Sequence, residues 1–334
     1  MIRHFDTPHW HAEFTPEQGG QLIRLRHLPT SRDILHHPAT PEHLQRQPER
    51  YGIPLLFPPN RVADGRFFWH GHHYALPLNE PARRNHIHGI TLNQPWTFVT
   101  ETNNSAAPDR VTLTFTHTPE HATYTGYPHR FRIELSHEFF PNEVRQTVRL
   151  QNLDKAGDSP QPYGLGFHTA FHVPVSAGAR LRITAARDAW ELDPDSRLPT
   201  GRKIPFPLGT GGGPFASSSP ITGAPLSCHV PLTTEATGAG FFRGAVIEFP
   251  EEDLRVAYEI GEDFRHWFLW TPPDEPDCLC LEPMTWMVNA PNLVRPPEVT
   301  GLMYLESGDT REFRARIVID GGLSVRQVPG GVSV

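Results

Sequence analysis

The sequence predicts an all-β protein built as a large antiparallel β-sandwich with few short helices. Three observations lead to this prediction. Apolar and polar residues alternate with a period of two in several segments, which places successive side chains on opposite faces of a strand. The chain contains 36 prolines and 27 glycines, and proline is far above its average usage of about 5%, which leaves little room for long helices. Helical periodicity is nearly absent.

Individual strands follow from this alternation. The clearest case is residues 111–116, and residues 130–135 and 144–150 form a second pair separated by Pro141-Asn142, which indicates an antiparallel meander. Further strand candidates are rich in β-branched and aromatic residues and are bounded by Gly, Pro or Asp. They are residues 96–100, 181–184, 245–249, 254–260, 267–270 and 314–319.

One short helix is predicted at residues 41–47, with Thr40 as its N-cap and Pro41 in its first turn, and Pro48 ends it. The glycine-rich stretch 209–219 is interpreted as a surface loop, because no Walker lysine follows it. Many short strands with such turns favour two packed sheets over a sheet wrapped by helices. We expect residues 1–334 to form one domain, since sandwiches and barrels often exceed about 200 residues as one unit.

The charge and the cysteine content favour a small polar ligand and a reducing compartment. The 37 acidic and 30 basic residues give a net charge of -7, and no Lys/Arg run is long enough to follow a phosphate backbone. The three cysteines, Cys228, Cys278 and Cys280, do not resemble a disulfide framework. No apolar run reaches signal-peptide or membrane-spanning length. We expect a cytoplasmic monomer or homodimer without a nucleic-acid or membrane partner.

The first candidate functional segment begins at residue 51 and continues to residue 89. An apolar stretch ends in two prolines and presents Asn60 and Arg61. Arginine supplies several rigid donors that suit hydroxyl oxygens. From these residues alone, a binding site and an ordinary turn with a surface arginine both remain open.

The second candidate segment, residues 162–172, places His168 among glycines and aromatic residues. Glycine lets the backbone approach closely, and partial shielding of an imidazole tunes its protonation. A lone histidine of this kind is usually structural, so both a structural and a catalytic role remain open.

The third candidate segment, residues 277–292, contains Cys278, Cys280 and Glu282. In a strand these three side chains share one face, so the carboxylate lies beside two small apolar groups. Such a carboxylate needs a partner or has a raised pKa. A functional role and a structural ion pair are both consistent with this pattern.

Other site classes have less support. His86 and His88 would share a strand face, which is compatible with two zinc ligands. The Cys-x-Cys pair is distant in the sequence, and neither HExxH nor CxxC occurs. The Gly-x-Ser-x-Gly motif of serine hydrolases is also absent. We predict no metal and no cofactor.

Together these segments resemble the aldose 1-epimerase family, whose members are β-sandwich proteins of about this length. The similar motifs occur in the family's order, from about residue 15 to residue 320. They are Gly52-Ile53-Pro54-Leu55-Leu56-Phe57-Pro58 with Asn60-Arg61, Asn85-His86-Ile87-His88-Gly89 with Trp96, Gly166-Phe167-His168-Thr169-Ala170-Phe171, and Leu281-Glu282-Pro283-Met284-Thr285. The resemblance implies a galactose mutarotase-like supersandwich and a hexose as the ligand.

The resemblance also implies the site residues. His168 would be the general acid and Glu282 the general base, while Arg61 and His88 would bind the sugar and Asn60 would support them. Cys228 stands where the family commonly has a sugar-binding aspartate, just before a histidine. A thiol is a weak hydrogen-bond donor and acceptor. A contact between Cys228 and the substrate therefore does not indicate which sugar is bound.

The implied activity is the interconversion of α and β anomers by opening and reclosing the hexose ring. Glutamate, with a reference pKa of about 4.3, can accept the anomeric hydroxyl proton, and histidine, near about 6.5, can donate one to the ring oxygen. A nearby carboxylate is expected to keep His168 protonated. Two alternatives remain: a sugar-binding protein without turnover, suggested by Cys228, and an epimerase for phosphorylated hexoses, suggested by Arg83 and Arg84.

Overall fold

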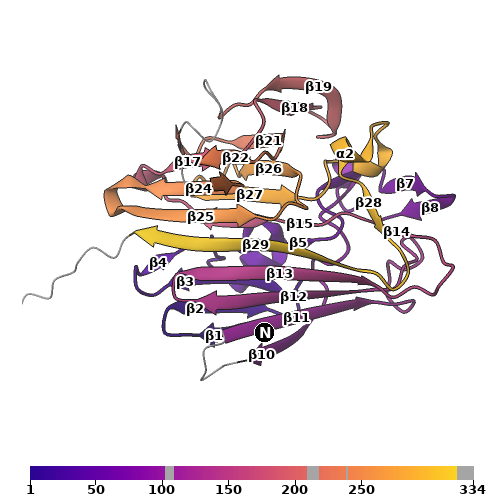
Figure 1. Ribbon diagram of the computed structural model, residues 1–334, viewed down its shortest axis with the longest axis horizontal. Helices are drawn as coiled ribbons and strands as arrows, with labels where there is room; N and C mark the ends of the chain where they lie inside the picture. Colours follow the sequence, from indigo (N-terminus) through magenta and orange to yellow (C-terminus); the bar gives the residue numbers. More distant parts are fainter. Residues whose placement is uncertain (102–108, 209–217, 238–239, 322–334) are drawn as a thin grey trace, which may run out of the picture.

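The computed structural model describes residues 1–101, 109–208, 218–237 and 240–321. Within these ranges the chain forms three large sheets and several two-stranded ribbons (Figure 1), and every pair of named strands is antiparallel. The predicted all-β antiparallel class is confirmed. Of the loop predicted at residues 209–219, residues 209–217 lie outside the described part.

The largest sheet has nine strands and contains most of the strands predicted from alternation. In spatial order they are β10 (Thr97–Glu101), β11 (Asp109–His117), β12 (Phe131–Phe140), β13 (Glu143–Asn152), β29 (Thr310–Gly321), β25 (Leu254–Ile260), β24 (Gly244–Phe249), β17 (Arg180–Ile183) and β20 (Ser219–Pro220). The predicted turn at Pro141-Asn142 joins β12 to β13, where Phe140 pairs with Glu143.

The second sheet has eight strands. Its order is β19 (Pro199–Pro205), β18 (Asp188–Leu192), β21 (Leu226–Pro231), β26 (His266–Thr271), β27 (Cys278–Met284), β15 (Gly166–Phe167) and β5 (Leu55–Leu56), and β16 (Thr169–His172) pairs with β27 off this path. The third sheet is β1 (Arg3–Asp6), β2 (Trp10–Thr15), β3 (Gln21–His27) and β4 (Arg32–Asp33).

Short ribbons and helical turns complete the described fold. The ribbons are β6 (Arg61–Ala63) with β9 (Asn85–Ile87), β7 (Arg66–Trp69) with β8 (His72–Ala75), β14 (Gln161–Tyr163) with β28 (Met303–Leu305), and β22 (Glu235–Thr237) with β23 (Gly240–Phe242). The helical elements are α1 (Pro41–Arg46), α2 (Pro297–Thr300) and the 3₁₀ turns η1 (Pro48–Arg50), η2 (Pro81–Arg83), η3 (Val175–Ala177), η4 (Pro250–Glu252) and η5 (Ala290–Asn292).

The helix predicted at residues 41–47 is confirmed as α1. Thr40 caps it, because its side chain accepts a hydrogen bond from the backbone N–H of His43. In the part of the chain that the structure describes, no helix has the length and apolar character to cross a membrane.

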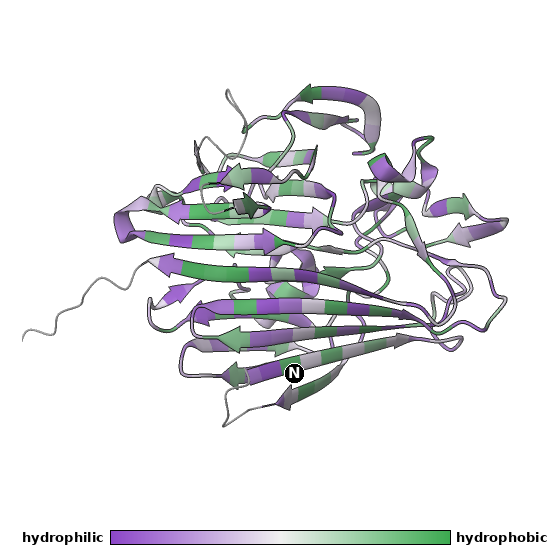
Figure 2. Ribbon diagram, viewed as in Figure 1, coloured by the Kyte–Doolittle hydropathy of each residue, from purple (hydrophilic) through white to green (hydrophobic). Residues whose placement is uncertain are grey.

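The main hydrophobic core lies between the nine-stranded and the eight-stranded sheets. In the nine-stranded sheet, Leu113, Leu135, Val148 and Phe313 are direct cross-strand neighbours and are all buried. The same core cluster contains Leu281 of β27 in the other sheet. Figure 2 shows the alternation of hydrophobic and hydrophilic residues along the strands of the nine-stranded sheet. This pattern is expected when one face of a sheet packs inward and the other contacts water.

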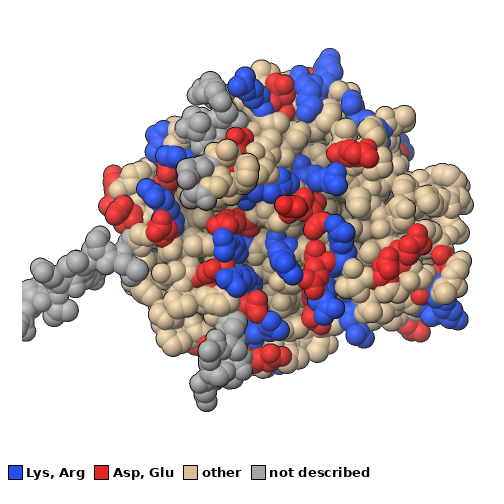
Figure 3. Space-filling view, in the orientation of Figure 1, with Lys and Arg blue, Asp and Glu red and all other residues tan. Residues whose placement is uncertain are grey.

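The outer face of the nine-stranded sheet carries rows of opposite charges (Figure 3). Arg316 pairs with Glu259 at 2.6 Å, and Arg149 pairs with Glu312 at 3.4 Å. Exposed pairs of this kind contribute about 0–1 kcal/mol each. This face is therefore a solvated surface, and the candidate site belongs to the eight-stranded sheet.

Candidate active site

A pocket of about 760 Å³ opens on the face of the eight-stranded sheet that points away from the main core. Strand alternation explains this placement, because Phe268 and Trp270 of β26 line the pocket while Leu269 between them belongs to the core. On β27, Glu282 lines the pocket and Leu281 belongs to the core. Segments before residue 100 supply much of the opposite wall, including Glu49, Asn60, Arg61, Glu80, Arg83 and His88.

The backbone places His168 and Glu282 against one another at the base of this pocket. His168 lies between β15 and β16, and its N–H donates to the carbonyl of Pro54 at 3.0 Å. Glu282 lies within β27, opposite Phe268. The distance from His168 Nε2 to Glu282 Oε1 is 3.3 Å. Both side chains are almost completely buried, at 3% and 2% exposed, and both line the pocket.

Burial disfavours charge on both members of this pair. It lowers the pKa of His168 to about 3, and the positive charge of Arg61 acts in the same direction. Burial also raises the pKa of Glu282 well above its ordinary value. The sequence had suggested that the carboxylate keeps His168 protonated, but loss of hydration outweighs that attraction. Both pKa shifts favour the uncharged forms, in which Glu282 carries a proton and His168 is neutral.

Each member of the pair also keeps one polar atom free for a ligand. His168 Nδ1 and Glu282 Oε2 are buried, and neither has a hydrogen-bond partner among the described residues. Buried polar atoms usually find partners. A ligand that offers several hydroxyl groups would satisfy both atoms.

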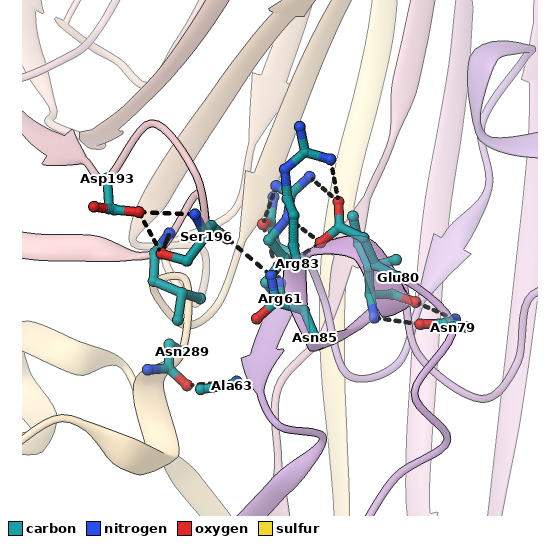
Figure 4. Close-up of polar contacts among 12 residues, drawn as sticks. Arg61, Ala63, Asn79, Glu80, Arg83, Asn85, Asp193, Ser196 and Asn289 are labelled. Atoms are coloured by element: carbon teal, nitrogen blue, oxygen red, sulfur yellow. Dashed lines mark hydrogen bonds and ion pairs between the residues drawn. The ribbon is translucent and has the colours of Figure 1, made fainter.

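Arg61 reaches the pocket on β6 and is held by Glu80, as Figure 4 shows. Its Nε and Nη2 donate to the two carboxylate oxygens of Glu80 at 2.8 and 2.9 Å. Burial alone would raise the pKa of Glu80, but hydrogen bonds from Arg61 and Asn85 lower it overall. Asn85 Nδ2 donates to Glu80 and also to the carbonyl of Ser196 at 2.8 Å, which ties this wall to the turn between β18 and β19.

Asn60 and His88 flank the pair through unusual backbone geometry. Asn60 has φ 53° and His88 has φ 64°, both in the left-handed region that non-glycine residues seldom occupy. Gly89 follows with φ 80°, and a Cβ there would lie 2.3 Å from the carbonyl oxygen of Phe57, so this turn requires glycine. The His88 ring stands nearly perpendicular to that of His168 at 5.1 Å. Backbone strain of this kind often occurs at functional sites.

Cys228 does not join these residues, which corrects the expectation from the sequence. On β21 it pairs with Leu269 and belongs to the main core cluster, with 5% exposure. Ser227, its neighbour, pairs with Trp270 and lines the pocket. Because successive side chains of a strand point to opposite faces, Cys228 points inward, and its position argues against the predicted substrate contact.

Changing Cys228 to serine should therefore affect stability and not ligand binding. We expect Cys228→Ser to destabilise the fold by about 1–3 kcal/mol, because it buries a hydroxyl in the core, with unchanged sugar affinity. Urea denaturation and calorimetric sugar titration measure the two quantities. Ser227→Ala is the matched control and should weaken sugar binding while leaving the stability unchanged. Weaker sugar binding by Cys228→Ser at wild-type stability would contradict this assignment.

Several pocket residues were not assigned a role from the sequence. Glu80 lies in the Asn79-Glu80-Pro81 motif. The sequence contains no periodic pattern that would predict its ion pair with Arg61. Trp270 lies with its ring 5.8 Å from that of His168 at 78°. Strand alternation could have identified Trp270 as a pocket residue once Phe268 was placed on the pocket face, because residues two apart in a strand lie on the same face.

The zinc hypothesis for His86 and His88 finds no third ligand in the part of the chain that the structure describes. His86 Nδ1 contacts the carbonyl oxygen of Pro77 at 2.7 Å. Among the described residues, two groups of three side chains have metal-ligand spacing, and neither includes His86 or His88. The members are His4, His11 and Glu13 in one group and His36, Glu275 and Cys278 in the other.

Comparison with known proteins supports the fold described above. Residues 9–317 match the family model described as aldose 1-epimerase. A galactose mutarotase-like protein from Clostridium acetobutylicum is 28% identical, with a TM-score of 0.83 over 95% of this chain and 94% of that one. A putative aldose 1-epimerase from Escherichia coli K12 shares the fold at 18% identity, with a TM-score of 0.73 over 96% of this chain and 99% of that one.

A curated relative matches over a shorter range. The uncharacterized protein YihR of Escherichia coli is 28% identical over 134 residues, which is 40% of this chain and 40% of that protein.

Proposed function

The chain belongs to the aldose 1-epimerase family, and we propose that it is an isomerase that interconverts the α and β anomers of a hexose. His168 and Glu282 carry the proton transfers, and Arg61 and His88 hold the sugar with support from Asn60. The observation that carries this proposal is the 3.3 Å contact between His168 Nε2 and Glu282 Oε1 at the base of a pocket large enough for a pyranose.

Ring opening needs one proton acceptor and one proton donor. Glu282 takes the proton from the anomeric hydroxyl while His168 gives one to the ring oxygen, and the bond between the anomeric carbon and the ring oxygen breaks. The resulting aldehyde rotates about its bond to the next carbon, and the reverse transfers close the ring on the other face. Each positioned transfer contributes about 10²- to 10⁴-fold.

This assignment requires the proton to be on His168 when the sugar is bound. Sugar hydroxyl groups donate to the carboxylate, and the ring oxygen accepts from the imidazolium, so both contacts favour the charged forms. Binding thereby opposes the effect of burial and moves the proton from Glu282 to His168. The pair is neutral overall in either arrangement, and each arrangement offers one donor and one acceptor.

Polarimetry tests the proposal directly. Freshly dissolved α-glucose or α-galactose should approach its equilibrium rotation faster in proportion to the concentration of the purified protein. Heat-denatured protein is the control for buffer catalysis. If no aldose relaxes faster with the folded protein than without it, the proposed activity is wrong.

A sugar-binding protein without turnover is the first alternative. This alternative is based on the presence of Cys228 where the family commonly has a sugar-binding aspartate. Because Cys228 points into the core and not into the pocket, that argument is weakened. Calorimetry combined with polarimetry separates the two functions. Saturable sugar binding without faster mutarotation would favour the binding protein.

An epimerase for phosphorylated hexoses is the second alternative, and one observation favours it. Arg83 lines the pocket beside Glu80 (Figure 4), and its Nε has no hydrogen-bond partner among the described residues. Arg84, in contrast, is 80% exposed in its side chain and pairs with Asp64. A comparison of rates on glucose and glucose 6-phosphate, repeated with Arg83→Gln, decides whether Arg83 binds a phosphate.

A further inference from the structure

A second cluster of reactive side chains lies outside the pocket. His36 Nε2, a carboxylate oxygen of Glu275 and Cys278 Sγ all lie within 4.8 Å of one another. The closest of these contacts joins His36 Nε2 to Glu275 Oε2 at 3.0 Å. None of the three residues lines the candidate active site. Residues almost 240 positions apart thus bring a nitrogen, an oxygen and a sulfur donor together.

The backbone and the aromatic neighbours hold His36 in place. Its N–H donates to the carbonyl of Ala170 at 2.9 Å, and its carbonyl accepts from the N–H of Gly52 at 2.8 Å. Its ring stacks on that of Tyr51, with centroids 5.4 Å apart and an interplanar angle of 15°. The imidazole therefore loses little freedom when it binds a ligand.

Glu275 and Cys278 are positioned by a proline-rich turn. The N–H of Cys278 donates to the carbonyl of Glu275 at 3.0 Å, which closes the turn before β27. Glu275 Oε1 accepts from the Tyr51 hydroxyl and from Arg50, each at 3.4 Å. These contacts leave Oε2 directed at His36. Hydrogen bonds from outer residues to a ligating carboxylate are typical of metal sites.

The donor set points to zinc. Zinc accepts imidazole nitrogen, carboxylate oxygen and cysteine sulfur together, in tetrahedral geometry, whereas calcium and magnesium take oxygen ligands. The site is accessible from one side, because the side chains of His36 and Glu275 are 17% and 24% exposed while Cys278 is buried. Three protein ligands leave the fourth tetrahedral position for water.

The other described group of three ligands fits zinc less well. His4, His11 and Glu13 lie on the β1 and β2 hairpin and offer no sulfur. His11 already contacts Asp6 at 2.6 Å and Glu13 at 3.0 Å. Its two ring nitrogens are thus committed to side chains of the same hairpin.

We propose that His36, Glu275 and Cys278 bind one zinc ion. The imidazole binds through Nε2 and the carboxylate through Oε2. The Cys278 thiol releases its proton to solvent as the zinc–sulfur bond forms, so zinc affinity rises with pH. The site is independent of the proposed sugar chemistry.

Metal titration of the chelator-treated full chain tests this site. We expect one equivalent of Zn²⁺ to bind by calorimetry, and one equivalent of Co²⁺ to give a thiolate-to-cobalt charge-transfer absorption. Cys278→Ser should abolish that absorption, and Cys278→Ser, His36→Gln and Glu275→Gln should each weaken zinc binding by more than about 100-fold, since loss of outer partners alone weakens it by about 10- to 100-fold.

Matched thiol and histidine controls make the result decisive. Cys280 Sγ lies 3.8 Å from Cys278 Sγ, so Cys280→Ser tests the neighbouring thiol, and Cys228→Ser tests a thiol in the core. Both variants, and His11→Gln in the other group, should retain the absorption and the affinity. Circular dichroism establishes that each variant is folded. Failure of the folded wild type to bind zinc or cobalt, a charge-transfer absorption that survives in Cys278→Ser, or its loss in Cys280→Ser would overturn the proposal.

Discussion

Replacing Glu282 with glutamine should reduce the rate of mutarotation by about 10²- to 10⁴-fold, the typical contribution of a positioned proton transfer. Glutamine keeps the size of the side chain and can hydrogen-bond to His168, but it cannot accept the proton of the anomeric hydroxyl. The loss should appear in kcat and not in sugar affinity. Polarimetry on glucose and galactose measures the rate, and calorimetry measures the affinity.

Two further variants make this result specific. Glu312→Gln removes a carboxylate from the outer face of β29 and should leave the rate unchanged. The double variant Glu282→Gln, His168→Asn should be about as slow as the single one, because residues that act as a unit are not additive. Wild-type rates for Glu282→Gln on every aldose tested would eliminate the proposed mechanism.

Acid should unfold this protein well above the pH at which its carboxylates titrate. Burial lowers the pKa of His137 and His266 to about 3 each. Below about pH 6.5 the unfolded chain binds protons at these residues and the folded chain does not, so protons favour unfolding. The stabilising effect of the neutral rings is complete above about pH 6.5 and decreases as the pH falls toward 3.

The expected size of this effect is large. Well below pH 6.5, each of these two buried histidines contributes about 1.4 kcal/mol per pH unit, hence about 3 kcal/mol per pH unit together. Between pH 6.5 and 5 the loss is about 3 kcal/mol, while total stabilities are only about 5–15 kcal/mol. Urea midpoints at pH 7.5 and pH 5.5 should therefore differ strongly.

His137 allows a direct test, because neither of its ring nitrogens has a hydrogen-bond partner among the described residues. His137→Leu should reduce the pH dependence of the unfolding free energy by up to about 1.4 kcal/mol per pH unit and should be more stable than the wild type at pH 5.5. His73→Ala, at an exposed position on β8, is the control and should keep the wild-type slope. Equal slopes for His137→Leu and the wild type would show that this buried ring does not drive acid unfolding.

Local alternation was sufficient to predict eight strands of the nine-stranded sheet, but not β20, whose first residue, Ser219, was interpreted as part of a surface loop. Residues 254–260 were predicted with the bounds of β25 itself, because one face of that strand is buried and the other is more exposed. The capping of α1 by Thr40 was equally predictable, since it depends on neighbouring residues. In contrast, β2 and β3 were not predicted, although both later proved to carry buried side chains of the core.

The site was only partly predictable. The motifs around His168 and Glu282 identified the pair, but no local pattern specifies which face of β21 meets the pocket. That choice depends on the register with β26, and the register places Ser227, not Cys228, beside Trp270. The prediction that His168 is protonated was also wrong, because the protonation state depends on burial in the folded structure and not on the residue types alone.

The imidazole of His168 and the carboxyl group of Glu282 are in contact and almost inaccessible to water. The proton that His168 gives to the sugar and the proton that Glu282 takes from it can therefore both be returned when the ring closes. On the proposed mechanism, no net exchange of hydrogen ions with the medium accompanies a catalytic cycle. The rate should then be indifferent to the concentration of buffer, unlike the spontaneous reaction in free solution.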